Sequence, residues 1–530
     1  MTTLVDQVMA ARSVSTPLIA ISTPDQPAVL MDLRTKLNGS IPLLSWDRSR
    51  GIQWLNEKGR SASSLAAVAF GLSEPFEKSI PIATVNPADA MRFIWYLPGA
   101  TKKDPSLGCV VIAQSMDRSF RDPSCAAETI QAILNLRESF KENLRTLIML
   151  APSFTLPPEL QHDVILLEDP LPTREAFVSI VKDVHDSAGL DEPTKEQTDK
   201  SILAVRGLSA FEAEQVLAMS VALAPKQDRI DLPSAWALKK AAVSKTEGLT
   251  MTLEGPDLSD LKGLDAIIRM LDGLWKGPKP PEVVMRVDEI DKGLAGLGSR
   301  GGPGDNTGVS QDLHQQFLVN MEDNGWIGAI LVGIRGSGKT ILTQSIGAAH
   351  GVPTIAMDPG KMKKPHVGES EQAFREAFRT VKAIGESNVL VLATCNRLDV
   401  IPPELMRRFK LGIWYFDLPS VEERDALWPI YLKKYGHPLD SERPNDTDWT
   451  GSEIRNACEI AYLLSITPKE AGELYVVPIT KSDQQSVQDL RKQAQNRFFS
   501  ASRGGTYNPQ MEEERKAEPS GRRFSMRKER

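Results

Sequence analysis

The sequence predicts an α/β protein built on two parallel β-sheets, and three observations support this fold class. Short apolar runs alternate with longer helix-like segments of mixed polarity along most of the chain. A glycine-rich octet at residues 333–340 stands between one apolar run and the next helix-like segment. Several short patterns of the first half return in the same order in the second half. Buried strands that alternate with helices are typical of parallel sheets covered on both faces.

The composition is that of a globular protein and argues against several classes of function. The 530 residues give room for about three or four domains. Lys and Arg number 63 against 69 Asp and Glu, so the formal net charge of −6 would attract neither nucleic acid nor an anionic membrane. No secretory signal opens the chain, and no apolar run approaches the roughly 18 residues of a membrane span. We therefore expect a cytoplasmic protein without membrane or nucleic-acid partners.

The first part of the chain, residues 1–225, is expected to form one α/β domain. Helices are predicted over residues 174–223, where apolar residues recur at three- and four-residue spacing. The apolar runs that we interpret as buried strands are residues 17–22, 107–114, 146–150 and 164–167. Glycine and proline then become frequent, so residues 226–281 are expected to be a linker with helices.

The second part is expected to contain another α/β domain, at residues 282–420, followed by a helical lid at residues 421–500. Its apolar strands are predicted at residues 283–287, 327–332, 354–357, 389–393 and 413–416. Residues 501–530 are polar and charge-rich without periodicity, which is typical of a disordered tail.

An internal repeat connects the two parts. Residues 41–47 resemble residues 352–358, and a Pro-Pro-Glu-Leu sequence occurs within both 156–160 and 401–405. Another apolar strand and a Leu-Pro pair follow in each case. We interpret this as two copies of one fold. The first copy lacks a phosphate loop, because its first strand runs into residues 22–27 without Gly-Lys-Thr.

The octet at residues 333–340 has the spacing of a phosphate-binding P-loop. Its glycines let backbone N–H groups turn toward phosphates, and the following helix adds the positive end of its dipole. In such a loop the lysine reaches the β- and γ-phosphates, and the last hydroxyl binds Mg²⁺. We therefore predict ATP and Mg²⁺ as ligands, held by Gly333, Gly336, Ser337, Gly338, Lys339 and Thr340.

Acidic residues follow the predicted strand at residues 282–287. Asp288 and Glu289 would lie at its carboxyl end, where α/β sheets bind ligands. An Asp there can hold Mg²⁺, and the neighbouring Glu can activate the attacking water. The same pair alone is often a solvated turn, but a P-loop in the same domain favours the catalytic interpretation. Arg286 inside the strand needs a partner or a sheet edge.

Three further residues are candidates for contact with the γ-phosphate. Asn396 ends the predicted strand at residues 388–396 and could orient the attacking water. Arg407 and Arg408 could stabilise transition-state charge on a neighbouring subunit's γ-phosphate. A solvated helix end remains the alternative for these two arginines until a ring is shown.

Together these segments resemble an AAA+ ATPase of the core AAA type. The supporting segments are the P-loop, the acid pair, residues 367–371, the sensor-1-like strand end at 393–396, the arginine-finger-like residues 403–409 and the sensor-2-like residues 450–454. The nearest branch is the two-domain AAA ATPase of cyanobacteria and plastid genomes, a hypothetical chloroplast reading frame. The resemblance implies a P-loop NTPase parallel sheet with a helical lid, preceded by a degenerate AAA-like α/β domain. It also implies a hexameric ring that remodels or regulates a partner protein.

The sequence departs from that family in two places. His366 stands where family members place an apolar residue that grips polypeptide in the pore, which argues against processive threading. The acid pair at 288–289 precedes the P-loop, whereas the family order is the reverse. The blocks at about 286–331 and 332–391 read as if they had exchanged places.

The exchanged order is compatible with the family sheet, whose strand order is 5-1-4-3-2. The acid strand would take position 3, the P-loop strand position 1, residues 354–358 position 2 and residues 388–396 position 4. Right-handed crossovers would keep the helices on their usual faces. Two links would each span one extra strand, roughly 4.8 Å. The alternative is a rearrangement that leaves the site impaired.

The sequence thus predicts an ATP hydrolase in which Lys339 and Thr340 hold phosphate and Mg²⁺, and Asp288 positions the metal. Glu289 would activate water, Asn396 would sense the γ-phosphate, and Arg407 or Arg408 would act in trans. The alternative function is a nucleotide-binding scaffold with little hydrolysis, which the displaced acid pair and His366 favour.

Overall fold

The computed structural model describes residues 3–37, 39, 41–100, 108–152, 154, 156–224, 229–294, 309–362, 369–397 and 401–509. His366 and the glycine-rich residues 298–308 lie outside these ranges. The chain divides into two compact units. The first unit is Met1–Ile180 with Ser209–Gln215, and the second unit is Val181–Leu208 with Val216–Arg530.

The first unit is built on a six-stranded sheet with the order β3-β2-β4-β5-β1-β6. Every neighbouring pair is parallel except β2 with β3. The strands are β1 (Leu18–Ser22), β2 (Leu43–Asp47), β3 (Gly51–Trp54), β4 (Val110–Gln114), β5 (Thr146–Ala151) and β6 (Ile165–Glu168). All residues of β1 and β5 are buried, which is why these strands read as unbroken apolar runs.

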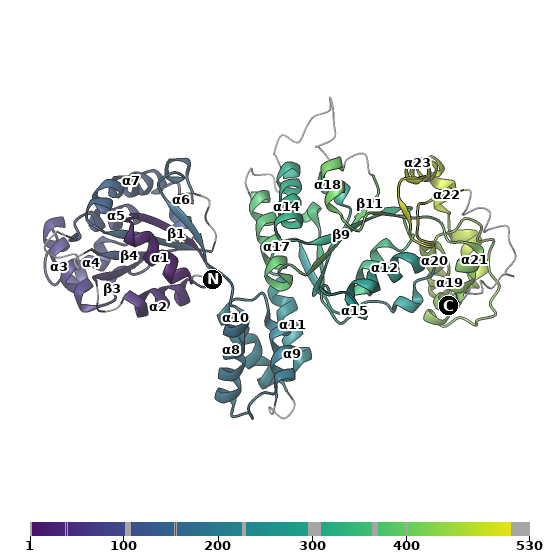
Figure 1. Cartoon of the computed structure of the whole chain (residues 1–530), viewed down its shortest axis with the longest axis horizontal. Helices are drawn as coiled ribbons and strands as arrows, with labels where there is room; N and C mark the ends of the chain where they lie inside the picture. Colours follow the sequence, from purple (N-terminus) through teal and green to yellow (C-terminus); the bar gives the residue numbers. More distant parts are fainter. Residues whose placement is uncertain are drawn as a thin grey trace, which may run out of the picture. The chain divides into compact units, whose positions relative to one another are not determined.

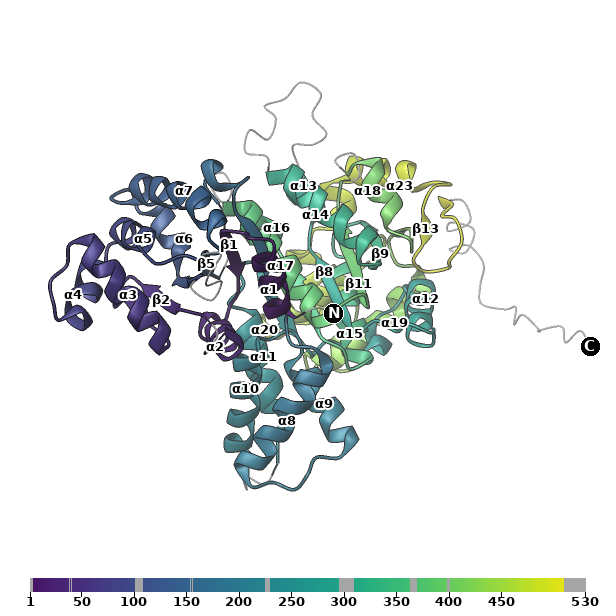
Figure 2. The same cartoon turned by 60° about the vertical axis from the view of Figure 1, so that its left-hand side comes forward.

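Helices cover both faces of this sheet (Figures 1 and 2). On one face, α1 (Leu4–Ser13) and α2 (Gln26–Leu37) bury their apolar side chains against β1. The opposite face carries α3 (Glu57–Phe70), α4 (Phe76–Ala83), α5 (Pro87–Trp95) and α7 (Ala126–Glu142). The short α6 (Met116–Arg121) follows β4. The predicted α/β fold is therefore confirmed for this unit.

Four helices occupy the region after β6. They are α8 (Arg174–Ala188), α9 (Lys195–Val205), α10 (Ala210–Leu223) and α11 (Leu232–Val243). The three- and four-residue spacing predicts the first three, and the fourth lies in the predicted linker. The boundary between the two units falls inside α8 and α10. Thr194 and Gln197 form a capping box that starts α9.

The second unit contains a seven-stranded sheet with the order β13-β12-β9-β11-β8-β10-β7. Its strands are β7 (Leu249–Thr252), β8 (Val283–Val287), β9 (Ile327–Gly333), β10 (Thr354–Met357), β11 (Val389–Cys395), β12 (Ile413–Phe416) and β13 (Phe499–Ser500). The five strands from β12 to β10 have the expected 5-1-4-3-2 order. The predicted linker contributes β7, which pairs antiparallel with β10 at the sheet edge.

The exchanged chain order fits the sheet because the direction of each link decides the face of its helix. The chain crosses the sheet one way from β8 to β9, back from β9 to β10, and the first way again to β11. Crossovers of one hand must then place α14 (Val309–Asp323) and α17 (Glu369–Gly385) on one face and α15 (Lys339–Ala349) on the other. The structure has this arrangement, with α12 (Asp265–Trp275) beside α15 (Figure 1).

Short helices follow several strands, and a group of lid helices follows β12. The short helices are α13 (Ile290–Leu294), α16 (Pro359–Met362) and α18 (Pro403–Arg408). The lid helices are α19 (Val421–Lys434), α20 (Gly451–Leu464), α21 (Pro468–Tyr475), α22 (Ile479–Ser482) and α23 (Gln484–Ala494). Capping boxes start α19, α20 and α21. A core around Trp428 and Trp449 holds the first two together.

The predicted disordered tail begins too early. Residues 501–509 belong to the fold, and Tyr507 is only 1% exposed. The chain turns back at Gly504 and Gly505, so that Thr506 pairs with Phe499. Polar composition hid this segment because a short turn needs few apolar residues. Residues 510–530 lie outside the described part, and the other predicted domain boundaries stay predictions.

Within the described ranges, the structure contains no helix with the length and apolar character needed to cross a membrane.

Candidate nucleotide site

The P-loop connects the carboxyl end of β9 to the start of α15. Gly336 and Gly338 have φ angles of 80° and 93°, which glycine adopts without the strain of a side chain. Gly338 is the N-cap residue of α15, and no side chain caps the helix there. The first N–H groups of α15 are therefore available to an anionic ligand.

Lys339 is only 8% exposed and folds back onto the loop. Its Nζ donates hydrogen bonds to the carbonyl oxygens of Gly333 at 2.7 Å and Ile334 at 2.9 Å. Burial lowers the pKa of Lys339 to about 8, although Asp291 and Glu289 act in the opposite direction. A phosphate would offer this ammonium group a stronger partner than the two carbonyls. Ser337 bonds to Ile334 O at 2.7 Å, and Thr340 is exposed at the helix start.

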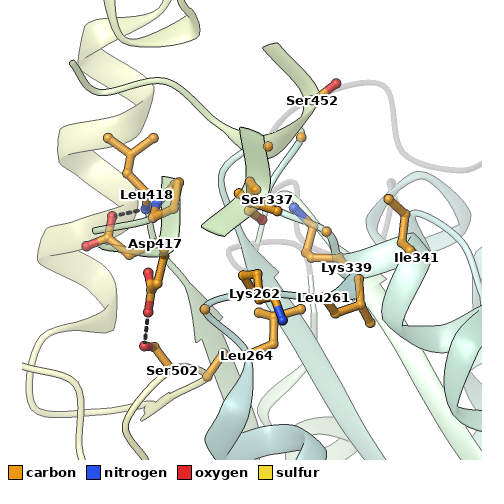
Figure 3. A pocket seen from close by; sticks show the side chains of 18 of the residues that line it. Leu261, Lys262, Leu264, Ser337, Lys339, Ile341, Asp417, Leu418, Ser452 and Ser502 are labelled. Carbon is orange, nitrogen blue, oxygen red and sulfur yellow. Dashed lines mark hydrogen bonds between the residues drawn. The ribbon is translucent and has the colours of Figure 1, made fainter. Parts of the chain in front are cut away.

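A cavity opens beside the loop, with about 1150 Å³ of empty space that includes open solvent. Figure 3 shows Lys339 and Ile341 on one side, Asp417 and Ser502 on the other, and Leu261, Lys262 and Leu264 between them. Lid residues Ser452 and Arg455 also line it. Because a P-loop fixes the phosphates near its lysine, the base of a nucleotide would extend toward Asp417 and Ser502.

The structure brings Glu289 and Asn396 together at the ends of β8 and β11. Asn396 Nδ2 donates to Glu289 Oε1 at 3.3 Å. The backbone N–H of Glu289 donates to Thr394 Oγ1 at 2.9 Å, and its φ is 49°. Lys292 Nζ lies 2.5 Å from Glu289 Oε2. These contacts hold the carboxylate in one orientation beside the strand ends.

Asp288 was expected to be a metal ligand, but its carboxylate also forms an ion pair. Its Oδ2 pairs with Arg286 Nη2 at 2.9 Å, so the strand arginine has found its partner. Its Oδ1 is buried and has no hydrogen-bond partner among the described residues. Burial raises the pKa of Asp288, and Arg286 partly opposes that change. Asp288 Oδ1 therefore suits Mg²⁺, which in nucleotide sites takes one or two protein ligands. Asp288 Oδ2 is already paired with Arg286.

Asp291 also lies beside these groups, and the sequence analysis gave it no role. It is 7% exposed, and its Oδ1 accepts a hydrogen bond from the backbone N–H of Asn396 at 3.2 Å. Its charge is among those that act on Lys339. Burial raises the pKa of Asp291. Its place one turn after the acid pair was visible in the sequence, but its inward direction depends on the short helix α13.

The two candidate arginines lie away from the cavity within one chain. Neither lines it in the described structure. Arg407 is exposed, whereas Arg408 Nη2 pairs with Glu322 Oε2 at 3.0 Å. Of these two arginines, only Arg408 forms an ion pair within the part of the chain that the structure describes.

Comparison with known proteins identifies AAA ATPase domains in both parts of the chain. Residues 329–386 match the AAA family, described as the ATPase family associated with various cellular activities. Residues 1–168 match the N-terminal domain of SpoVK-like AAA ATPases. The chain is therefore a protein with AAA ATPase domains, as its fold and P-loop indicate. The AAA match begins in β9 and does not include the acid pair.

The chain is also similar to individual proteins with AAA domains. It is homologous to the AAA domain-containing protein ycf46 of Guillardia theta, with 22% identity over 393 residues, 66% of this chain and 68% of the relative. The ycf46 protein of Trieres chinensis is 22% identical over 395 residues, 66% and 69% of the two chains. The ATP-dependent zinc metalloprotease FtsH of Karelsulcia muelleri is 27% identical over 188 residues, 26% of this chain and 30% of that protein.

Proposed function

We propose that the second unit binds ATP with Mg²⁺ and hydrolyses it, and that the chain uses this cycle to remodel or regulate a partner protein. The observation that carries the proposal is the hydrogen bond between Glu289 and Asn396, beside a buried P-loop lysine on which the Glu289 charge acts. A base and a polar sensor near a phosphate-binding lysine are the groups that phosphoryl transfer to water requires.

Each residue has a distinct part in this proposal. Lys339 holds the β- and γ-phosphates, and Thr340 and Asp288 hold Mg²⁺. The metal would neutralise charge that develops on the phosphate oxygens. Glu289 accepts a proton from the attacking water, and Asn396 orients that water against the γ-phosphate. Burial around Lys339 excludes bulk water and strengthens these interactions.

We further propose a homo-oligomeric ring, a hexamer, in the cytoplasm. The exposed Arg407 would act on the γ-phosphate of the neighbouring subunit. Mixing Arg407→Ala chains with Glu289→Gln chains tests this, because mixed rings contain sites with both intact residues. Turnover above that of either variant alone supports action in trans.

Steady-state ATP turnover with Mg²⁺ tests the enzyme proposal. We expect turnover by the parent chain, and a loss of about 100-fold or more in Glu289→Gln with ATP binding retained. Lys339→Ala should lose binding itself. A parent chain that binds ATP but turns it over no faster than Glu289→Gln would contradict hydrolysis.

The pairing of Asp288 with Arg286 favours a second function, a nucleotide-binding scaffold with little hydrolysis. An Asp that is neutralised by an arginine is a weaker ligand for Mg²⁺. Arg286→Met separates the two functions, because it frees the carboxylate. Turnover that rises in this variant from near zero supports the scaffold, and turnover that falls supports the enzyme.

A further inference from the structure

The segment after the last lid helix forms a short hairpin, residues 495–507, which we call the C-terminal hairpin. Its two arms are joined by hydrogen bonds from Asn496 N to Tyr507 O at 2.9 Å and from Tyr507 N to Phe498 O at 2.7 Å. Its first arm contains β13, which pairs parallel with β12. The hairpin therefore carries the chain from the lid back to the sheet of the ATPase domain.

The tip of the hairpin is bonded to two walls of the nucleotide cavity. Ala501 N donates to Tyr415 O at 3.0 Å, at the end of β12. Ala501 O accepts from Ala266 N at 3.2 Å and Ile267 N at 3.1 Å. These are first-turn N–H groups of α12, whose N-cap Leu264 offers no side-chain acceptor. The hairpin thus fixes the start of α12, and Leu264 lines the cavity.

A half-buried polar cluster attaches the base of the hairpin to the end of β12. Tyr507 Oη donates to Asp417 Oδ2 at 2.6 Å, and Arg491 Nε donates to Asp417 Oδ1 at 2.9 Å. The rings of Tyr507 and Tyr415 have centroids 4.5 Å apart. Because Arg491 belongs to α23, this cluster joins the last lid helix, the hairpin and the edge of the cavity.

Ser502 connects the hairpin to the first lid helix. Its Oγ donates to Glu423 Oε1 at 2.7 Å, drawn as a dashed line in Figure 3. The other oxygen of Glu423 accepts the N–H of Ser420 at 2.8 Å in the capping box of α19. Ser500, Ala501 and Ser502 line the cavity, and Figure 3 shows Ser502 at the end away from Lys339. The position of α19 is therefore tied to the hairpin where the base of a nucleotide would lie.

We propose that the C-terminal hairpin is the wall of the cavity that receives the nucleotide base, and that Ser502 is a positioning residue that holds the lid against it. This inference rests on the proposed ATP binding. If the hairpin only completed the sheet edge, its loss would lower stability and leave the affinity for ATP unchanged. As a cavity wall, it sets affinity for the base and leaves the triphosphate contacts intact.

Variants of Ser502 test the inference through binding of Mg·ATP and Mg·tripolyphosphate, a probe with phosphates and no base. Ser502→Ala removes the bond to Glu423 and should weaken ATP binding about three- to tenfold. Ser502→Leu adds bulk to the wall and should weaken it about tenfold or more. Ser502→Thr keeps the hydroxyl and should restore affinity. Tripolyphosphate affinity should stay within about twofold throughout.

Ser441 provides the matched control, because it is half-buried like Ser502 but belongs to the lid, and its Oγ donates to Pro438 O at 2.7 Å outside the cavity. Ser441→Ala and Ser441→Leu should not change ATP affinity.

ATP affinity within twofold of the parent in all Ser502 variants overturns the hairpin inference alone. Equal loss of tripolyphosphate and ATP binding also overturns it. A parent chain that binds no ATP overturns the proposed function and the inference together.

Discussion

The two sheets of this chain share one spatial order of strands but differ in the order in which the chain visits them. Read from β2, five strands of the first sheet run β2-β4-β5-β1-β6, and read from β10, five strands of the second run β10-β8-β11-β9-β12. Of these five strands, the chain visits the P-loop-equivalent strand β1 first in the first sheet, and the acid strand β8 first in the second. Strand pairing and crossover hand, which both sheets obey, therefore constrain the architecture more tightly than chain order does.

The sheets also differ at the helix that follows the P-loop-equivalent strand. In the first unit Asp25 Oδ1 accepts the N–H of Ala28 at 3.1 Å, so a carboxylate of the chain caps α2. Thr23 nearby donates to Asp169 Oδ2 at 2.7 Å. In the second unit Gly338 leaves the start of α15 without such a cap. The first unit thus fills with its own side chain the position that the second keeps open for an anion.

A third difference lies after the acid strand. Ser115 with φ 53° and Glu289 with φ 49° occupy the same left-handed turn after β4 and β8. The residue before that turn is Gln114 in the first unit and Asp288 in the second. The turn is retained in both copies, whereas the acid pair Asp288 and Glu289 and the phosphate loop occur in one. We therefore expect one nucleotide per chain.

The largest effect should come from Lys339→Ala. Loss of the ammonium group that contacts the phosphates should weaken ATP binding by about 100-fold or more, because Lys339 is the buried cation of the P-loop, whereas Arg335 is exposed. Calorimetric titration should give one site per chain for the parent and none for the variant. Unchanged thermal unfolding is the control for folding. One remaining site per chain would mean that the first sheet binds nucleotide and would break the comparison.

Gly336→Ala should have the next largest effect. A Cβ at Gly336 would lie 2.7 Å from Ser452 Cβ and 3.0 Å from Thr450 Oγ1, so the lid could not seat against the loop. We expect ATP affinity to fall about tenfold or more, beyond a backbone cost of about 1 kcal/mol in stability.

Gly351→Ala is the matched control for that substitution. Gly351 has φ 66°, and nothing lies within 4 Å of the point that a Cβ would occupy there, so only the backbone cost applies. Both variants should lose similar stability, and Gly351→Ala should keep the parent's affinity. Equal affinities in the two variants would show that lid contact at Gly336 is unimportant.

The fold of both units was predictable from sequence because it depends on local patterns. Unbroken apolar runs marked β1 and β9, and the repeat of Pro-Pro-Glu-Leu sequences linked the two copies. Edge strands were not predictable in this way. The short β13 depends on pairing with β12, and β7 depends on antiparallel pairing with β10. Such strands carry little periodicity of their own.

The candidate site was predictable where chemistry depends on spacing, and not where it depends on distant partners. The P-loop residues follow from one octet. The pairing of Asp288 with Arg286 depends on two side chains of one strand end sharing a face, a consequence of two-residue alternation that the sequence contained. The orientations of Asp291 and Ser502 depend on partners more than 70 positions away along the chain. Asp291 accepts a hydrogen bond from Asn396, and Ser502 donates one to Glu423.

The pH dependence of ATP binding should reveal the buried lysine. Burial lowers the pKa of Lys339 to about 8, and bound phosphates would raise it because they favour the charged form. Above pH 8 the free protein must then take up a proton to bind ATP. Affinity should fall by up to about tenfold per pH unit above 8 and stay constant below it.

Calorimetry at pH 9 in two buffers of different ionisation enthalpy measures this proton uptake directly. Lys239 is the control, since burial lowers its pKa to about 7 and its Nζ bonds to Leu203 O at 2.9 Å, outside the cavity. Lys239→Met should leave the uptake unchanged. Affinity that does not vary between pH 8 and 9.5 would contradict a buried, partly neutral Lys339.

The smallest effect should come from Asp25→Ala, which removes the carboxylate cap of α2 in the first unit. Loss of a helix cap typically costs about 1 kcal/mol, so amide exchange over Gln26–Leu37 should accelerate about fivefold while ATP turnover stays unchanged. Asp231→Ala removes the equivalent cap of α11, where Asp231 Oδ2 accepts the N–H of Ser234 at 3.1 Å, and should accelerate exchange only over Leu232–Val243. A second nucleotide per chain in Asp25→Ala would show that this one carboxylate is what closes the first sheet to phosphate. No gain would show that the missing loop and lysine are required as well, which is the outcome we expect.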